Sequence, residues 1–121
     1  MWCQFMDMHS GGHCKEKPYE YIYIEAPLKE AKVIFYNRFG HNPDRVTCTC
    51  CGEDYSITES DSLEQASGYE RKAKYDSEKY TGGLPLEDYL EMGNVLVIYD
   101  QGIADSERVG EVPQQGHVWV D

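Results

Sequence analysis

The chain has 121 residues, a length that suits a single domain over residues 1–121, because one hydrophobic core can be buried efficiently at this size. Its 22 Asp and Glu residues outnumber 11 Lys and Arg residues, and the net charge of −11 repels nucleic-acid backbones and membrane headgroups while attracting basic protein surfaces. No apolar run reaches the roughly 20 residues of a membrane span, and the first residues lack a signal-peptide pattern. We therefore expect a cytoplasmic protein with no direct nucleic-acid partner and no membrane contact.

The negative charge is placed unevenly along the chain. Residues 1–47 hold six basic and six acidic residues, whereas residues 48–121 hold five basic and sixteen acidic ones. The five cysteines form an odd number and include the adjacent Cys50 and Cys51, so they cannot all pair in disulfides within one chain. This cysteine usage favours a reducing compartment.

Strand and helix signals alternate in the first half of the chain. Residues 2–8 have the length and composition of a strand, and a glycine-containing loop follows. Residues 19–25 alternate Tyr with Ile or Glu, which predicts a strand with Tyr19, Tyr21 and Tyr23 on one face. Pro27 and the apolar spacing after it predict a helix over residues 27–39, ended by Gly40. We expect the cysteines in a turn, before a strand over residues 54–58.

The second half predicts two more helices and two more strands. Asp61 with Glu64 resembles a capping box and predicts a helix over residues 62–74, although Gly68 weakens it. Residues 85–92 predict a short helix, residues 95–99 a central strand buried on both faces, and residues 116–120 a last strand. We expect residues 100–115 to form an exposed connection. The predicted fold class is therefore α+β, with a small mixed or antiparallel sheet of four to five strands and about three helices. A zinc knuckle at the cysteines is a further feature that this fold could include.

The cysteine cluster carries the most specific chemistry. Cys48 and Cys51 form a Cys-x-x-Cys pair with Gly52 behind it, a spacing at which a tight turn directs two thiolates toward one Zn²⁺ ion. Two further ligands are needed, and the N-terminal segment offers Cys3, His9, His13 and Cys14. Buried thiols without a metal are the alternative. A redox role is weaker, because residues 54–58 read as a strand where a redox pair would be followed by a helix.

Two other groups of residues suggest ligand binding. Asp7 and His9 lie two residues apart before Ser10 and two glycines, an arrangement that suits a metal or phosphate site, or hydrolysis with His9 as base. The plainer interpretation is a loop held by hydrogen bonds from Asp7 and His9. The face of Tyr19, Tyr21 and Tyr23 offers a stacking platform for a nucleotide or an anchor for a protein, unless a helix of the protein covers it.

Four segments carry a resemblance to a known family. They are Asp7–Gly12 (DMHSGG), Tyr21–Pro27 (YIYIEAP), Phe39–Pro43 (FGHNP) and Val46–Ile57 (VTCTCCGEDYSI). Across about residues 1–75 the chain resembles a family of uncharacterised small proteins of tailed bacteriophages, which implies a phage accessory protein acting in the host bacterial cytoplasm. After Gly12 the family pattern continues with Gly and Gln where this chain has His13 and Cys14, which favours Cys3 and His9 as the partners of Cys48 and Cys51.

The acidic second half and the resemblance together predict a function. We expect a non-catalytic protein that inhibits or modulates a host protein with a basic surface, for example in a defence system such as CRISPR or restriction. The expected contact residues are acidic: Glu87, Asp88, Glu91, Asp105, Glu107 and Glu111. Two alternatives stay open. One is a nucleotide or small-molecule binding protein or hydrolase centred on Asp7, His9 and Ser10, and the other is a metal-stapled structural component of the phage.

Overall fold

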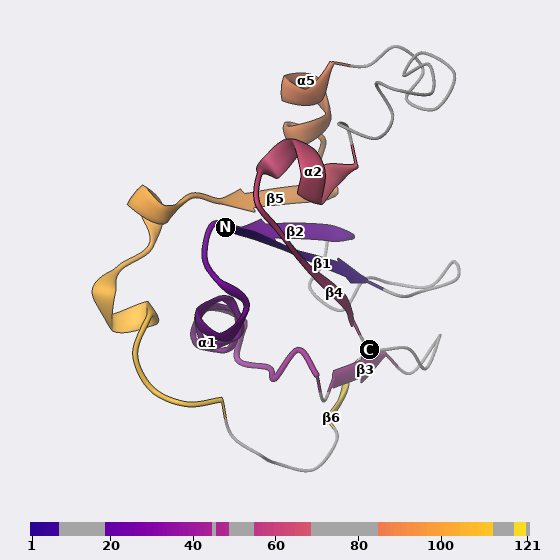
Figure 1. Ribbon diagram of the computed structural model, residues 1–121. Helices are drawn as coiled ribbons and strands as arrows, with labels where there is room; N and C mark the ends of the chain where they lie inside the picture. The colour runs from indigo at the N-terminus through magenta and orange to yellow at the C-terminus, as the bar shows by residue number, and fades with distance from the viewer. Residues whose placement is uncertain (8–18, 45, 49–54, 69–84, 113–117, 121) are drawn as a thin grey trace.

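The computed structural model describes residues 1–7, 19–44, 46–48, 55–68, 85–112 and 118–120 (Figure 1). Along the chain its elements are β1 (Trp2–Asp7), β2 (Tyr21–Ile24), α1 (Leu28–Phe39), β3 (Val46–Cys48), β4 (Tyr55–Ser60), α2 (Leu63–Ser67), α5 (Leu86–Leu90), β5 (Val95–Ile98) and β6 (Val118–Val120), with two 3₁₀ turns, η1 (Asp100–Gly102) and η2 (Asp105–Glu107). Strands and helices are interspersed around one mixed sheet, which confirms the α+β class.

The main sheet has four strands in the order β4-β1-β2-β5. β1 is antiparallel to both of its neighbours, and β5 runs parallel to β2. β3 and β6 pair in parallel as a separate two-stranded sheet, so the last strand predicted near the C-terminal end is present. Cys48 ends β3, and the prediction of a turn at this position is therefore wrong.

β5 lies at an edge of the sheet, which corrects the prediction of a central strand. Its apolar run instead reflects contacts on both faces of that edge. Val95 and Val97 pack with one hydrophobic cluster, whereas Leu96 and Ile98 pack with the other. A continuous apolar strand thus indicates that both of its faces are packed against other elements, and it does not indicate a central position in the sheet.

One face of the sheet packs against α1 (Figure 1). Phe5 of β1 and Phe35 of α1 are fully buried, and their rings stack with centroids 4.8 Å apart. The register pairs Phe5 with Ile22, so their side chains share this face, and Ile34 of α1 is also fully buried in the cluster. The buried apolar surface here is the main source of stability for the described part of the fold.

The opposite face is covered by α2 and α5 (Figure 1). Trp2 and Tyr23 are buried there with Ala66 of α2, and Tyr89 of α5 packs against the same cluster. The hydroxyl groups of Tyr23 and Tyr89 lie 2.8 Å apart, and the Gln4 amide donates to the Tyr23 hydroxyl at 3.1 Å. The protein is therefore a three-layer arrangement with the sheet in the middle.

Helix α1 ends where its sequence signals predict and begins one residue later than predicted. Pro27 is its N-cap and not its first helical residue, and the Glu59 carboxylate of β4 accepts from the Leu28 backbone N–H at 2.7 Å. This carboxylate satisfies a free N–H and complements the positive end of the helix dipole. At the other end Gly40 has φ 79°, the left-handed conformation expected of a C-terminal glycine.

Helix α2 is shorter than predicted. Ser62, not Asp61, is the N-cap, and its Oγ accepts from the Gln65 N–H at 3.1 Å. Gly68 then takes φ 82° and ends the helix, because glycine enters this conformation at no steric cost. Residues 69–74 of the predicted helix lie outside the described residues. The third helix likewise covers Leu86–Leu90 of the predicted 85–92.

Candidate functional site

The described residues carry all of the net negative charge. They include fifteen Asp and Glu residues against four Lys and Arg residues, whereas the rest of the chain holds seven of each sign. The described part of the chain is therefore strongly acidic.

Three of the four described basic side chains form ion pairs with carboxylates. Lys32 contacts Asp44 at 2.9 Å, and Arg38 contacts Glu107 at 2.8 Å. Arg108 contacts Glu30 at 2.9 Å and Asp100 at 2.7 Å. Because these cations are already engaged, they do not offset the other carboxylates of the surface.

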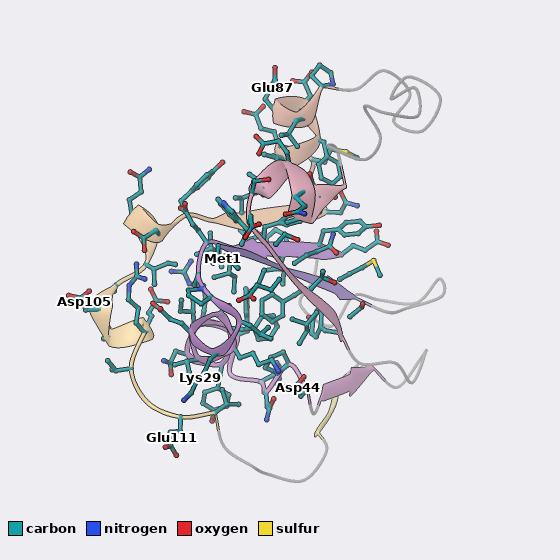
Figure 2. All side chains as sticks on the ribbon, in the orientation of Figure 1. Met1, Lys29, Asp44, Glu87, Asp105 and Glu111 are labelled. Atoms are coloured by element: carbon teal, nitrogen blue, oxygen red, sulfur yellow. The ribbon has the colours of Figure 1, made fainter. Side chains whose placement is uncertain are left out.

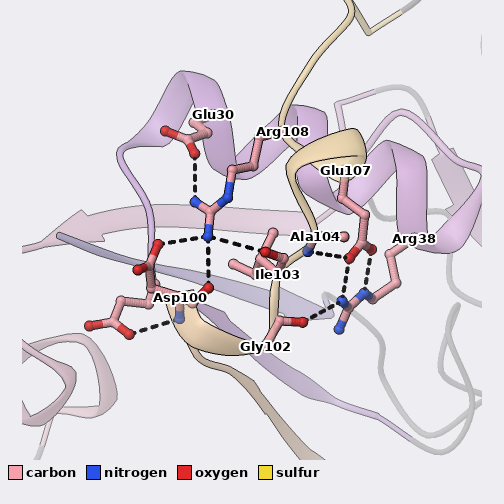
Figure 3. Close-up of polar contacts among 9 residues, drawn as sticks. Glu30, Arg38, Asp100, Gly102, Ile103, Ala104, Glu107 and Arg108 are labelled. Atoms are coloured by element: carbon pink, nitrogen blue, oxygen red, sulfur yellow. Dashed lines mark hydrogen bonds and ion pairs between the residues drawn. The ribbon is translucent and has the colours of Figure 1, made fainter.

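The two arginines fasten residues 99–112, which we name the strap, to helix α1 (Figure 3). The Arg38 guanidinium forms a two-point bond to Glu107, with Nε and one NH2 donating to the two carboxylate oxygens at 2.9 and 2.8 Å. This bond lowers the pKa of Glu107 and raises that of Arg38. Such bidentate pairs define geometry as well as contributing energy.

Arg108 is the second fastening point of the strap (Figure 3). Its guanidinium donates to Glu30 of α1, to the carboxylate and backbone oxygens of Asp100, and to the Ile103 backbone oxygen. The hydrogen bond to Glu30 and, to a smaller extent, the bond to Asp100 raise the pKa of Arg108. The Asn37 amide adds bonds to the backbone oxygens of Glu107 and Val109.

The connection predicted over residues 100–115 is mostly exposed in its described part, residues 100–112, but it is also fastened to α1. Ile103 is buried in the α1 cluster, and Glu107 is occupied by Arg38. Sequence reasoning missed Arg38, Arg108 and Asn37. The contacts between α1 and the strap join residues that lie 64 to 78 positions apart in the chain, so no local sequence pattern predicts them.

The six predicted partner-binding acids do not form one surface. Figure 2 places Glu87 on α5 at one end of the molecule, whereas Asp105 and Glu111 lie on the strap beside α1. Glu107 is taken by Arg38 and is only partly exposed. The prediction of one acidic face is therefore wrong, because the helix and the strap cover different layers.

A smaller acidic surface is nevertheless present on the helices that cover the tyrosine face. It comprises Asp61, Glu64, Glu87, Asp88 and Glu91, all exposed, and we name it the acidic helix pair. The segments 61–68 and 85–92 that carry it contain no Lys or Arg. Met92, at the end of α5, is 44% exposed and adds an apolar side chain to this surface.

The predicted tyrosine platform is covered. Tyr23 is fully buried and Tyr21 is half-buried, and both rings lie against Tyr89 of α5 with centroids 6.4 and 6.3 Å away. Burial raises the pKa of both phenols. Tyr19 instead packs with the cluster on the α1 face, because the chain bends at Glu20 and interrupts the alternation. The three rings therefore do not share an open face.

The structure tests only part of the predicted metal site. Cys3 is fully buried, and its thiol lies 3.4 Å from the Ala26 backbone oxygen. Burial, with a further contribution from Glu59, raises its pKa to about 11. Cys3 lies near the start of β1, and Asp7 lies at its other end, about 13 Å away along the strand. Asp7 pairs with Tyr55, the first residue of β4 after the cysteine segment. The register thus holds Cys3 away from that end of the strand.

The other predicted ligands fall largely outside the described residues. Cys51, His9 and Ser10 are not among them, and Asp7 and Cys48 are described as strand backbone. Within the described ranges, no three His, Cys, Asp or Glu side chains come together in a way that could hold a metal ion. The zinc site stays a prediction.

Comparison with known proteins gives no match for the chain. No family model, no curated protein sequence and no solved structure matches it. In the part of the chain that the structure describes, no helix combines the length and apolar character needed to cross a bilayer.

Proposed function

We propose that this protein is a non-catalytic phage accessory protein that binds the basic surface of a host protein and thereby inhibits or modulates it. The observation that carries the proposal is the acidic surface: the net charge is −11, and the segments 61–68 and 85–92 present five exposed carboxylates and no Lys or Arg. The phage origin rests on the resemblance of the DMHSGG and VTCTCCGEDYSI segments to phage proteins.

The acidic helix pair is the surface that best suits such binding. Its five carboxylates are exposed on or next to two short helices, whose side chains Leu63, Ala66 and Tyr89 pack against the sheet. A rigid base of this kind lets charges meet a partner without a large ordering cost. Charge complementarity mainly speeds association, and an apolar contact such as Met92 supplies area that excludes water.

The proposal is tested with the triple variant Glu87→Gln, Asp88→Asn and Glu91→Gln. Tagged wild-type protein is used to capture partners from bacterial lysate, and the Kd of each purified partner is then measured by calorimetry at low and high salt. We expect at least one partner with a basic surface whose affinity falls as salt is added. Its affinity should also fall about tenfold or more in the triple variant, because both salt and the substitutions weaken the electrostatic attraction between the two proteins.

A matched control removes one carboxylate from the strap. Asp105→Asn also removes negative charge, but it lies away from the helix pair (Figure 2) and is expected to leave the Kd within about twofold. Capture of no partner, or of one whose affinity ignores both salt and the triple substitution, contradicts the proposal. Circular dichroism checks that each variant retains the fold.

A further inference from the structure

Strand β5 forms an edge of the main sheet, and its bonds to the β2 segment fix the direction of its backbone groups (Figure 1). The carbonyl oxygens of Asn94 and Ile98 accept from backbone N–H groups of that segment at 3.1 and 2.9 Å. In a strand, the N–H and C=O of a residue point to the same side, and successive residues alternate. The residues that direct their backbone groups away from the sheet are therefore Val95, Val97 and Tyr99.

Four of these outward groups have no hydrogen-bond partner among the described residues. The Val95 N–H donates to the Met92 carbonyl oxygen at 3.1 Å, and the Tyr99 carbonyl oxygen accepts from the Gly102 N–H at 2.8 Å. The remaining groups are the C=O of Val95, both groups of Val97 and the N–H of Tyr99. Two acceptors and two donors thus lie in a row along this edge.

This row is complementary to itself when two copies meet with their β5 strands antiparallel. If Val97 lies opposite Val97 of the second copy, each N–H meets the C=O of the other residue, and each Tyr99 N–H meets the C=O of the opposite Val95. All four outward groups of each copy are then paired. The two groups already bound within the chain lie at the outer ends of this ladder. The opposing side chains, Val97 with Val97 and Tyr99 with Val95, are favourable cross-strand pairs.

The sequence of this edge lacks the features that protect edge strands from pairing. No charged residue and no proline occurs between Met92 and Tyr99, and the side chains of these two residues are each 44% exposed. Protected edge strands commonly carry charges, proline or a bulge. The opposite edge strand, β4, contains Glu59 and is followed by Asp61. The two edges of the sheet therefore differ, and β5 is the one suited to pairing.

We propose that β5 pairs antiparallel with β5 of a second copy of this chain, so that two main sheets join across a two-fold axis. A two-fold axis places identical surfaces against each other and is the commonest symmetry of soluble oligomers. Each copy carries a net charge of −11, so the copies repel one another at low ionic strength. The dimer is therefore reversible and strengthens as salt is added. Binding to the host partner proposed above weakens with salt, so the two proposals fail independently.

Analytical ultracentrifugation of the full chain tests the dimer. Samples from about 10 µM to about 1 mM are compared at about 50 and about 500 mM NaCl. We expect the average mass to rise from that of the monomer toward twice that value, with a Kd about threefold or more lower at the higher salt concentration. A protein that stays monomeric over this range, or that associates less at high salt, overturns the proposal.

Amide hydrogen exchange identifies the edge that pairs. In NMR spectra of the ¹⁵N-labelled chain, we expect the Val97 and Tyr99 amides to exchange about fivefold or more slowly at about 1 mM than at about 10 µM, because only the monomer exposes them. The Leu96 and Ile98 amides face β2, and their exchange rates are expected to agree within about twofold. Exchange of Val97 and Tyr99 that does not change with concentration contradicts pairing through β5.

Substitutions on the two edges of the sheet form a matched set. Val97→Pro removes an outward N–H, a loss that an edge strand tolerates in the monomer, and Tyr99→Lys places a charge at the paired edge. Each is expected to raise the Kd of the dimer about tenfold or more. Thr58→Lys makes the same charge change at an exposed position of β4 and should leave the Kd within about twofold.

Tyr99→Lys leaves the Val97 backbone unchanged and so tests the edge without the demands that proline places on folding. Circular dichroism checks that each variant retains the fold. If Tyr99→Lys dimerises as well as Thr58→Lys does, β5 is not the interface and the proposal is overturned.

Discussion

The role inferred for Cys3 from the sequence differs from the role that its position in the structure supports. In the sequence it is a thiol near the chain start and a candidate zinc ligand. In the structure it is fully buried on the α1 face, beside the Ala26 carbonyl oxygen and influenced by Glu59. A thiol with a pKa raised to about 11 remains protonated at neutral pH, and protonated thiols are poor nucleophiles and poor ligands.

The reactivity of Cys3 is therefore expected to be very low in the folded protein. At pH 8 the Cys3 thiol is almost entirely protonated, and its side chain is closed to solvent. Peptide mass spectrometry after a short iodoacetamide pulse should show Cys3 unlabelled, with full labelling after unfolding in urea. Rapid labelling of Cys3 in the native protein would contradict its place in the core.

At the scale of elements, the strap depends on contacts that span the chain. Its residues have little regular structure of their own, with only two short 3₁₀ turns. The strap is held instead by Arg38 and Arg108 and by the buried side chain of Ile103. Because Arg38 lowers the pKa of Glu107 below 4.5, the folded state favours the ionised carboxylate.

This ion pair predicts a pH dependence with a defined sign. The lowered pKa means that the stabilisation by Glu107 is complete above about pH 4.5 and is lost as the pH falls through the lower folded-state value. We expect Glu107→Gln to reduce the free energy of unfolding by about 0.2–1 kcal/mol at pH 7, and this difference to shrink below pH 4.5. Urea unfolding at pH 7, 5, 4 and 3 measures it.

The control for this prediction is Glu87→Gln on α5. Glu87 is exposed and forms no ion pair within the described residues, so its substitution should shift the unfolding free energy by less than about 0.2 kcal/mol at each pH. A Glu107→Gln penalty that persists unchanged at pH 3 would show that the carboxylate charge is not its cause.

At the scale of the whole molecule, stability comes from two apolar layers on a thin sheet. Phe35 is at the centre of the α1 layer, where its ring contacts those of Phe5, Phe39 and Tyr55 at 4.7 to 5.1 Å between centroids. Removing this ring leaves a space that the surrounding aromatic side chains cannot fill completely.

Phe35→Ala is expected to lower the free energy of unfolding by about 3–5 kcal/mol. Val109→Ala serves as the comparison, because Val109 is 66% exposed on the strap, and its loss should cost no more than about 0.5 kcal/mol. Chemical denaturation of both variants provides the measurement. A cost for Phe35→Ala below about 1 kcal/mol would place the core elsewhere.

The sequence by itself determined the elements whose signals are local. Helix α1 lies within one residue of its predicted bounds, because the apolar spacing and Gly40 are local signals. β1, β2 and β5 also lie where their composition and alternation predicted strands. Local signals were weaker at α2, where Gly68 ended the helix early.

Only the tertiary structure decided which faces stay open and which charges stay unpaired. Tyr23 is covered because Tyr89, 66 residues away, reaches its hydroxyl, and Arg108 meets Glu30 across 78 residues. The pairing of Arg38 with Glu107, 69 residues away, likewise removes Glu107 from the predicted acidic surface. Contacts between distant residues depend on how the layers assemble, and nothing in the local sequence around either partner encodes them.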